Sequence, residues 1–543
     1  MKFLDSIRRR KTNFGESSSG LKRVLSLRDL VFLGMAAIIG GGIFSSVGEA
    51  CANGGPAIIY LFIICAIACG FAALCYAEFS TRIPVSGSAY TYAYASFGEL
   101  FAWIIGWALL MEYAIGNIYV SFSWSGYFVN LLENMHVHIP EWLTMSYVAA
   151  KKSITTDTHA LAAWSSAPII GGLRIILDLP AILINIFITA LVYIGISESK
   201  RASNIMVLLK VAVIIMVIIV GFFYIDFDNY VPFMPTGFGG VMGSVSAVFF
   251  TYIGFDALST MAEECENPKR DLPRGMLYSL LICTVLYILI SLVLTGMVNY
   301  TSLNVTDPLA FALAEKGVKW LEYIVSISAV IAMTSVLLVF QMGQPRIWFS
   351  MSRDGLIPKK FSTIHPKYKT PSFATIATGL VVGIPILFTD KDFVLDFTSI
   401  GTLFAFVLVC GGILLLPRRK KEKGRFHMPH IKAKYTYPLL ALASALISNY
   451  FIPDYFSEMV QPENFNSIFG LSHILFWIIV IILSVFAFLK DWSLIPLLGV
   501  STCLYLLTGM EMSNWFWFFV WFVIGIIIYF IYGYRKSALN TDK

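Results

Sequence analysis

Fourteen stretches of this chain are long and apolar enough to cross a lipid bilayer as α-helices. A spanning helix needs about 20 mostly apolar residues, because the hydrocarbon core is about 30 Å thick. Hydrophobic residues fill 57% of the 543 positions and charged residues only 13%, which is too little charge to cover a water-soluble protein of this size. We therefore expect an all-α polytopic membrane protein. The expected spans are residues 29–50, 56–80, 98–131, 179–197, 203–224, 241–264, 275–298, 321–348, 373–389, 393–416, 435–452, 471–489, 491–508 and 515–533.

The basic residues predict the orientation of these spans. With the N-terminus inside and an even number of spans, 32 of the 38 Lys and Arg residues outside the spans or at their ends fall on the cytoplasmic side. Such an excess marks cytoplasmic loops, so both termini are expected in the cytoplasm and the protein in the cell (plasma or inner) membrane. The net charge of +6 then reflects topology and does not indicate a nucleic-acid partner.

We expect no metal site, because His136, His138 and His159 stand in a polar loop without cysteine or clustered carboxylates. No cofactor is expected either.

The spans and the loops between them divide the chain into five parts. These are a polar, basic tail at 1–28, a ten-helix core at 29–416, a basic cytoplasmic loop at 417–434, four additional helices at 435–533 and a tail at 534–543.

The first span carries three consecutive glycines near its middle. Each glycine loses roughly 1 kcal/mol of helix propensity relative to alanine and leaves the backbone open to a ligand. We expect the half-helix that starts near Gly42 to offer free amides to a carboxylate, and the carbonyls of Ile38 and Ile39 to suit an ammonium group. Close helix packing through small residues is the alternative. The expected substrate-binding positions here are Ile38, Ile39, Gly40, Gly41, Gly42 and Ile43.

The sixth span carries a second interruption at residues 252–257. Asp256 places an ionisable side chain at mid-membrane, which is costly and usually functional. Its carboxylate is expected to cap the second half-helix and leave the Gly254 and Phe255 carbonyls free for an ammonium. Phe255 is expected to close over the ligand as a gate, with a lipid-facing or core-facing ring as the alternative. The expected binding positions in this span are Gly254, Phe255, Asp256 and Ala257.

Two broken spans five helices apart are typical of transporters built from inverted repeats. We therefore expect helices one to five and six to ten to form a 5+5 inverted-repeat core, with spans one and six facing each other at the midplane. An amino acid carries both the carboxylate and the ammonium that such a site would receive.

Four segments resemble a known family. Residues 34–44 resemble the first-helix motif of the amino acid–polyamine–organocation superfamily, and residues 76–90, 249–260 and 346–355 resemble its cationic amino acid transporter branch. The resemblance covers roughly residues 25–420 and implies a permease that couples amino-acid transport to protons. One departure is Gly41, because the family commonly has threonine between the two outer glycines.

Lys210 and Glu112 are the expected proton-coupling residues. Lys210 is the only Lys or Arg deep inside a span, since Arg346 lies at the cytoplasmic end of its span, and snorkelling to the cytoplasmic interface is the simplest alternative for Lys210. Similar transporters carry a lysine here in span five, which implies an ammonium close to the first-helix break, where sodium-coupled relatives hold a cation. Glu112 lies within span three, where it would pair with Lys210, relay protons or complete a polar network.

Further charged residues are expected at the cytoplasmic end of the core. Glu263, Glu264 and Arg346 are expected to form inner-gate contacts, and Glu78 with Arg82 a structural ion pair one helical turn apart. The resemblance implies that cationic substrates need space and a polar lining near span eight. The residues there are bulky, such as Met333 and Phe340, so we expect neutral, small-to-medium amino acids at least as readily as arginine or lysine. An amino-acid exchanger or a sodium-coupled transporter of the same fold remains open, whereas a channel or a membrane enzyme is disfavoured. The oligomeric state is left open.

Overall fold

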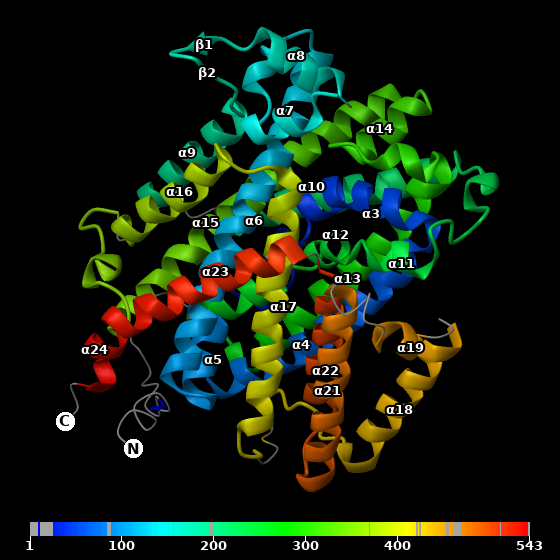
Figure 1. Cartoon of the computed structure of the whole chain (residues 1–543). Helices are drawn as coiled ribbons and strands as arrows, with labels where there is room; N and C mark the ends of the chain where they lie inside the picture. The colour runs from blue at the N-terminus through cyan, green and yellow to red at the C-terminus, as the bar shows by residue number, and fades with distance from the viewer. Residues whose placement is uncertain are drawn as a thin grey trace.

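The computed structural model of the chain is a bundle of helices with one short hairpin (Figure 1). This confirms the expected all-α membrane class, because among the described residues nine helices are long and apolar enough to cross a membrane. Three shorter apolar helices accompany them. The structure describes residues 9–10, 25–83, 88–155, 157–195, 200–368, 370–419, 422, 425–451, 455–460, 468–510 and 512–540.

The first part of the core begins with an interrupted helix. The helix α2 ends at Ile38, and the chain becomes helical again at η1, a turn of π-helix that leads into α3. Four longer helices and one short helix follow. The elements are α2 (Leu27–Ile38), η1 (Gly42–Ser46), α3 (Val47–Gly54), η2 (Gly55–Ala57), α4 (Ile58–Arg82), α5 (Ser88–Ser96), α6 (Glu99–Asn134), α9 (Leu179–Ile194) and α10 (Lys200–Phe222).

The second part of the core repeats this order. The long helix after each break has 25 residues in α4 and 30 in α13, and the next has 36 in α6 and 35 in α15. The inverted symmetry itself stays a prediction. The elements are η4 (Phe227–Tyr230), α11 (Gly237–Met242), α12 (Val245–Phe250), η5 (Phe255–Glu264), α13 (Pro268–Met297), η6 (Tyr300–Leu303), α14 (Pro308–Glu315), α15 (Lys319–Arg353), η7 (Lys359–Ser362), α16 (Ser372–Ile386) and α17 (Lys391–Leu415).

Local polar residues determine where several of these helices begin and end. Asp178 accepts the Ala181 amide at the start of α9 at 3.0 Å, and Asp390 accepts the Phe393 amide at the start of α17 at 2.9 Å. Such caps satisfy amides that have no partner within the helix. Gly195 ends α9 with φ 78°, a left-handed conformation that glycine adopts without steric cost.

The long loop between α6 and α9 folds into a small cap at one end of the bundle (Figure 1). Arg174 lies 4.8 Å from the centre of the Trp164 ring, and Ala150, Ala167 and Ile176 form a small apolar core beside it. The sequence identified this segment only as a polar stretch. Its elements are η3 (Glu141–Leu143), α7 (Tyr147–Ser153), α8 (Thr158–Ser166), β1 (Ile169–Ile170) and β2 (Leu173–Arg174).

The remaining helices lie beside the core. Helix α22 packs on α17 and α4, whereas α23 crosses α6, where Trp521 stacks on Trp107 at 4.5 Å. Helices α18 and α21 form an outlying pair (Figure 1). These elements are α18 (Ala433–Phe451), α19 (Tyr455–Val460), α21 (Ile468–Leu489), α22 (Leu494–Thr508), α23 (Met512–Ile528), η8 (Tyr529–Gly533), α24 (Tyr534–Lys536) and η9 (Ala538–Asn540).

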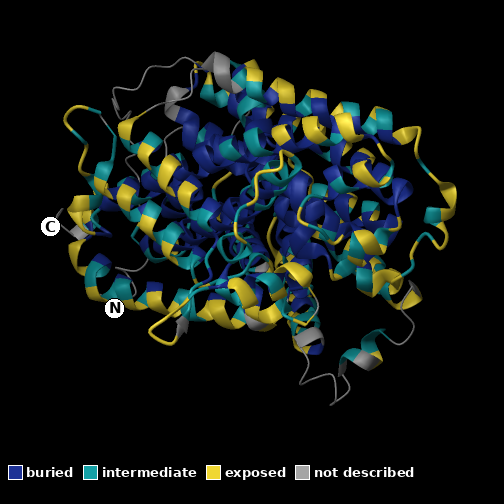
Figure 2. Cartoon of the chain, turned by 90° about the horizontal axis from the view of Figure 1, so that it is seen from above, coloured by how far each residue is buried: buried dark blue, intermediate teal, exposed yellow. Residues whose placement is uncertain are grey.

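Burial separates central helices from peripheral ones. The spanning window of α6 is 94% buried, whereas that of Gly470–Leu489 is only 11% buried. Figure 2 shows the same distribution, with buried residues in the interior and exposed residues around the outside. Because the exposed positions of these peripheral helices are apolar, lipid is the solvent they suit. Each of the fourteen expected spans coincides with helical chain, but fourteen complete crossings remain a prediction.

Candidate substrate and coupling site

The break in the first span leaves a run of backbone amides open. Ile39 adopts an extended conformation with ψ 97°, which ends α2 one residue after Ile38. We find no acceptor among the described residues for the amides of residues 40–43, and the first helical bond after the break joins the Phe44 amide to the Gly40 carbonyl. Four amides at the start of a half-helix form an arrangement that suits a carboxylate.

The glycines of this break also allow very close packing. A Cβ atom at Gly40 would lie 2.5 Å from Val336 of α15, and one at Gly42 would lie 2.7 Å from the Thr251 backbone. At Gly41 the nearest atom, in the Tyr119 ring, is 3.3 Å away. Close packing, which the sequence offered as an alternative, is therefore present together with the open amides.

The break in the sixth span meets the first one. Helix α12 ends at Phe250, and Gly254 has φ 120° before η5 begins. A Cβ atom at Gly254 would lie 2.8 Å from the Ala37 carbonyl oxygen, so only glycine fits this contact. The expectation that spans one and six face each other at their breaks is met in the described residues.

The carbonyls available in the sixth span differ from those expected. The Gly254 carbonyl accepts the Ala257 amide at 3.1 Å, because it starts the tight helix η5. The carbonyls of residues 251–253 have no donor within the part of the chain that the structure describes. The open acceptors therefore lie one to three residues before Gly254.

Lys210 lies in the protein interior beside the first break. Its side chain is 0% exposed, and its ammonium donates to the carbonyls of Ala36 at 3.4 Å and Ile39 at 3.3 Å, as well as to the Ser335 hydroxyl. Snorkelling to the membrane surface does not occur in this structure. The Ile39 carbonyl does receive an ammonium, but it is the protein's own. The Ile38 carbonyl accepts the Tyr287 hydroxyl at 3.0 Å.

Glu112 interacts with Thr402 and Asp256 in the interior of the bundle. The Glu112 carboxyl is beside the Thr402 hydroxyl and within electrostatic reach of Asp256. The Asp256 carboxyl lies beside the backbone amides of residues 254, 256 and 257, but Gly254 is the N-cap of η5 and no side chain caps this helix, so the expected capping role of Asp256 stays a prediction. Glu112 Oε2 and Asp256 Oδ2 are buried without a hydrogen-bond partner among the described residues. Of the three expected roles of Glu112, a polar network agrees best with these contacts.

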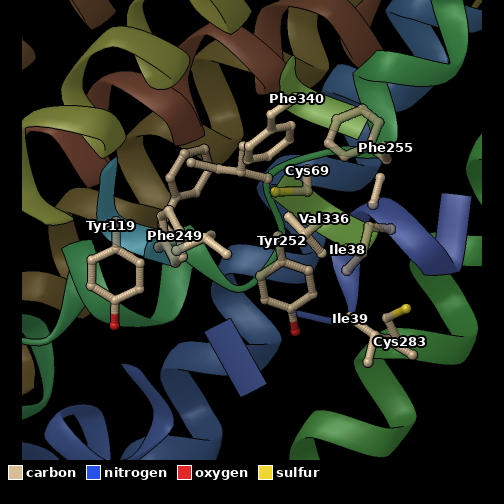
Figure 3. Packing of buried hydrophobic residues seen from close by; sticks show 14 of the residues in the cluster. Ile38, Ile39, Cys69, Tyr119, Phe249, Tyr252, Phe255, Cys283, Val336 and Phe340 are labelled. Carbon is tan, nitrogen blue, oxygen red and sulfur yellow. The ribbon is translucent and has the colours of Figure 1, made fainter. Parts of the chain in front are cut away.

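The expected gating residues occupy two places. The Phe255 ring is fully buried and packs edge-on against Tyr76 at 6.0 Å and beside Phe406 at 5.2 Å; Figure 3 shows it among the apolar side chains around the breaks. Arg346 donates to the Met261 sulfur of η5 at 3.0 Å. The side chains of Glu263 and Glu264 lie outside the described part of the structure, and their gating role stays a prediction.

Lys391 is a contact that the sequence analysis missed. Its ammonium donates to Ser45 of η1 at 2.5 Å and lies 5.5 Å from the centre of the Tyr119 ring. Burial raises the pKa of the nearby Asp307, which interacts electrostatically with Lys391, to about 6. In the sequence, Lys391 falls in the short segment between the expected spans 373–389 and 393–416, on the side expected to be outside. Its position directly after the capping residue Asp390 was the available signal.

Two helices that are interrupted where they meet are a feature of many transporter folds. The comparisons with known proteins agree. The chain belongs to the amino acid permease family, whose sequence profile matches residues 25–462, and the profile for the C-terminus of such permeases matches residues 494–537. The resemblance inferred from residues 34–44 and the later motifs is thereby confirmed.

Several named transporters are similar to the chain over most of its length. The branched-chain amino acid permease BcaP of Bacillus subtilis is 38% identical over 97% of this chain and 96% of its own. The methylthioribose transporter of the same organism is 37% identical, covering 96% of each chain. The vacuolar cationic amino acid transporter 4 of Arabidopsis thaliana is 36% identical over 73% of this chain and 63% of its own. The protein is therefore a multi-pass membrane permease of an amino-acid transport family.

Proposed function

We propose that the protein is a secondary active transporter that carries amino acids across the cell membrane together with protons. Transport would follow alternating access, with both termini in the cytoplasm. The proton gradient supplies the energy, and no cofactor is required.

The observation that carries this proposal is the position of the Lys210 ammonium. The ammonium donates hydrogen bonds to the Ala36 and Ile39 carbonyls at the end of α2, and the residue is fully buried. A charged group is costly inside a membrane unless partners compensate it, so its protonation depends on those contacts. When the half-helices move, the carbonyls and Ser335 separate from the amine and the proton leaves. One proton is thereby linked to one cycle.

The two breaks support a single orientation of a bound amino acid. The carboxylate would accept hydrogen bonds from the amides of residues 40–43, where the dipole of the half-helix is favourable. The ammonium would donate to the open carbonyls of residues 251–253. Lys210 would occupy the remaining acceptors of the first break and exclude the reverse orientation.

Neutral amino acids with apolar side chains are the proposed substrates. Met333, Val336 and Phe340 of span eight are all buried, and Val336 packs directly on Gly40. These apolar residues favour a substrate with an aliphatic side chain, because they offer no partner that would compensate the burial of a cationic one. The name of the branched-chain permease relative points the same way. Methylthioribose is the second candidate, because the relative named for it is about as similar over the same length.

The coupling proposal is tested with purified protein in liposomes. Under an imposed pH gradient, wild-type protein is expected to accumulate leucine, and Lys210→Ala is expected to lose accumulation down to the level without a gradient. Counterflow exchange persists in the variant if binding and folding are retained. Lys151→Ala, which removes an exposed loop lysine, is the matched control and is expected to behave as wild type.

Other results would select the alternatives. Accumulation that requires sodium, or that requires internal amino acid at every pH gradient, would replace proton symport by sodium coupling or exchange. Unchanged pH-driven accumulation in Lys210→Ala would remove the coupling role of this residue. Uptake of methylthioribose without competition by any amino acid would replace the proposed substrate.

A further inference from the structure

A cavity of about 310 Å³ with both apolar and charged lining residues lies where the basic loop after α17 meets α4 and the start of α22. It is at the end of the bundle where α4 and α17 finish, the end at which the chain termini also lie (Figure 1). The residues that matter for its chemistry are Arg82, Arg418, Arg419, His430, Asp491 and Ser493.

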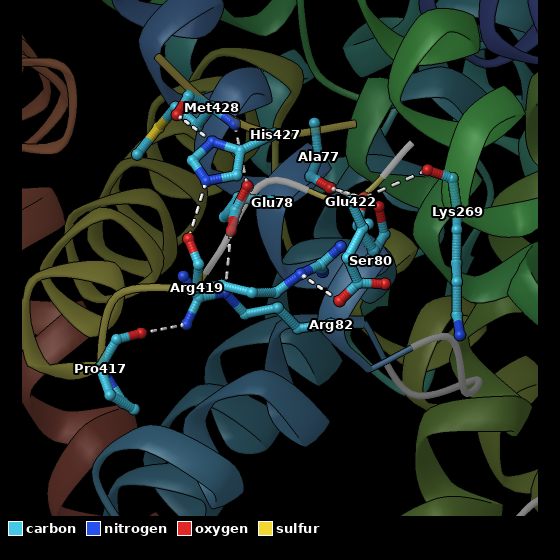
Figure 4. A network of polar contacts seen from close by, with 11 residues as sticks. Ala77, Glu78, Ser80, Arg82, Lys269, Pro417, Arg419, Glu422, His427 and Met428 are labelled. Carbon is cyan, nitrogen blue, oxygen red and sulfur yellow. Dashed lines mark hydrogen bonds and ion pairs between the residues drawn. The ribbon is translucent and has the colours of Figure 1, made fainter. Parts of the chain in front are cut away.

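One wall of this cavity is fixed by a hydrogen-bonded network (Figure 4). The expected Glu78–Arg82 ion pair is confirmed at 2.9 Å, and Glu78 also accepts the Met428 amide at 2.9 Å. Arg82 donates to the Pro417 carbonyl at 2.9 Å, so the loop is tied to α4 at Pro417 and at Met428. His427 lies between the carbonyls of Met428 and Arg419. These hydrogen bonds and the ion pair fix the position of this wall.

The carboxylates around the cavity already have cationic partners. Asp491 lies 2.5 Å from Arg418, whose hydrogen bond and charge hold the pKa of Asp491 below its usual range. Glu422 pairs with Arg425. Arg419 Nε is 3.3 Å from the same Glu422 carboxylate, in a geometry that makes no hydrogen bond.

Three buried donor atoms in this lining make no hydrogen bond. Arg419 Nη2 and the Ser493 hydroxyl have no acceptor among the described residues, and Arg419 Nε has only its ion pair with Glu422. Ser493 is only 9% exposed and stands at the N-cap position of α22, yet its side chain does not cap the helix. A buried donor without an acceptor costs free energy, so an absent acceptor is indicated.

A phosphate group has the chemistry that these donors require. Its oxygens accept charge-assisted hydrogen bonds from a guanidinium, and the start of a helix such as α22 favours negative charge. The volume exceeds that of a phosphate alone and admits a small attached group. We propose that this cavity binds the phosphate group of an anionic phospholipid or of a free phosphorylated molecule from the side on which the basic loop lies.

Such a ligand would join the core to the additional helices. Arg419 belongs to the loop tied to α4, whereas Ser493 belongs to α22. A phosphate between them holds the inner end of α4 to a helix outside the ten-helix core. Since α4 follows the first broken helix, occupancy of the cavity is expected to stabilise the protein and to change its transport rate. This inference does not depend on the identity of the transported substrate.

Thermal unfolding of the full-length protein in neutral detergent tests the proposal. Inorganic phosphate and short-chain phosphatidylglycerol are compared with chloride at equal ionic strength. The wild type is expected to be stabilised by at least one of them, and Arg419→Gln and Ser493→Ala are each expected to weaken the apparent affinity by roughly tenfold, or about 1.4 kcal/mol. Lys434→Gln removes the same charge from an exposed position in the first turn of α18, directly after this loop, and is expected to respond as wild type.

The two compounds tested distinguish a lipid from a soluble molecule as the source of the phosphate group. A response to phosphatidylglycerol alone identifies a lipid site, and a response to inorganic phosphate identifies a soluble ligand. Stabilisation of neither kind in the wild type overturns the proposal, as does an equal response in Arg419→Gln and Lys434→Gln. If Arg419→Gln does not fold, Ser493→Ala decides by the same comparison. Leucine counterflow by each variant measures the transport site separately.

Discussion

The two broken helices present opposite halves of the peptide group to the space between them. In the first break the amides of residues 40–43 are open, while the carbonyls of Ile38 and Ile39 are occupied by Tyr287 and Lys210. In the second break the amides of residues 251–253 bond back to α12, and the carbonyls of the same residues are open.

This difference gives the site a direction. A helix that simply stops exposes donors on one side and acceptors on the other, so two equal breaks would accept a zwitterion in either orientation. Here the Ile38 and Ile39 carbonyls of the first break already accept from groups of α13 and α10. One break is therefore left with donors and the other with acceptors. The asymmetry comes from side chains and not from the glycines.

The largest effect is expected where the two breaks touch. Gly42→Ala would place a Cβ atom 2.7 Å from the Thr251 backbone and push the open amides away from the open carbonyls. We expect leucine counterflow to fall to background, with the free energy of unfolding lowered by about 1–3 kcal/mol, as is typical of overpacking. Gly70→Ala in α4, where nothing lies within 4 Å, is the matched control. Wild-type counterflow in Gly42→Ala would show that the breaks need not touch.

The positions of the breaks were predictable from the sequence, but their chemistry was not. Three adjacent glycines and the mid-membrane Asp256 locate the breaks, because both features are costly in a continuous helix. Which carbonyls remain open depends on Tyr287 and Lys210, whose helices are distant in the sequence. The sequence therefore assigned an acceptor role to Ile38, Ile39 and Gly254, whose carbonyls already have partners.

Packing partners account for the other differences. Lys391 adjoins an outside loop in the sequence, and only the approach of α17 to η1 brings its ammonium to Ser45. Likewise, the sequence predicted the Glu78–Arg82 pair from its one-turn spacing, but it contained no sign of the cavity beside it. The relative position of residues within one helix can be predicted from the sequence because helix geometry determines it. Contacts between helices depend on the tertiary fold.

A smaller effect is expected where α17 holds the half-helix of the first break. Lys391→Met would remove the bond to Ser45 and free the end of the half-helix that carries the open amides. We expect the buried Cys51 of α3 to react several-fold faster with a membrane-impermeant maleimide added outside, because outward opening becomes easier. The modified residue is identified by mass spectrometry.

Lys152→Met is the control for this measurement. Lys152 also pairs with carboxylates near the start of α17, but its side chain is 59% exposed, and such pairs contribute little. Its Cys51 reactivity is expected to match the wild type. Equal reactivity in both variants would show that Lys391 does not restrain the half-helix, and the comparison of the two breaks would then rest on the backbone alone.

The smallest effect is expected from opening one acceptor in the first break. Tyr287→Phe removes the hydroxyl that donates to the Ile38 carbonyl at 3.0 Å and so makes the two breaks more alike. The loss of one hydrogen bond is expected to lower the free energy of unfolding by about 1 kcal/mol and to change the apparent affinity for leucine by less than about fivefold. Tyr230→Phe is matched to it, since that hydroxyl donates to the Leu292 carbonyl of the same helix at 2.8 Å and not to a carbonyl of either break. Because both variants lose the same kind of bond, their stabilities should fall together, and only Tyr287→Phe should alter affinity. An equal change of affinity in both would mean that the occupied carbonyl has no part in orienting the substrate.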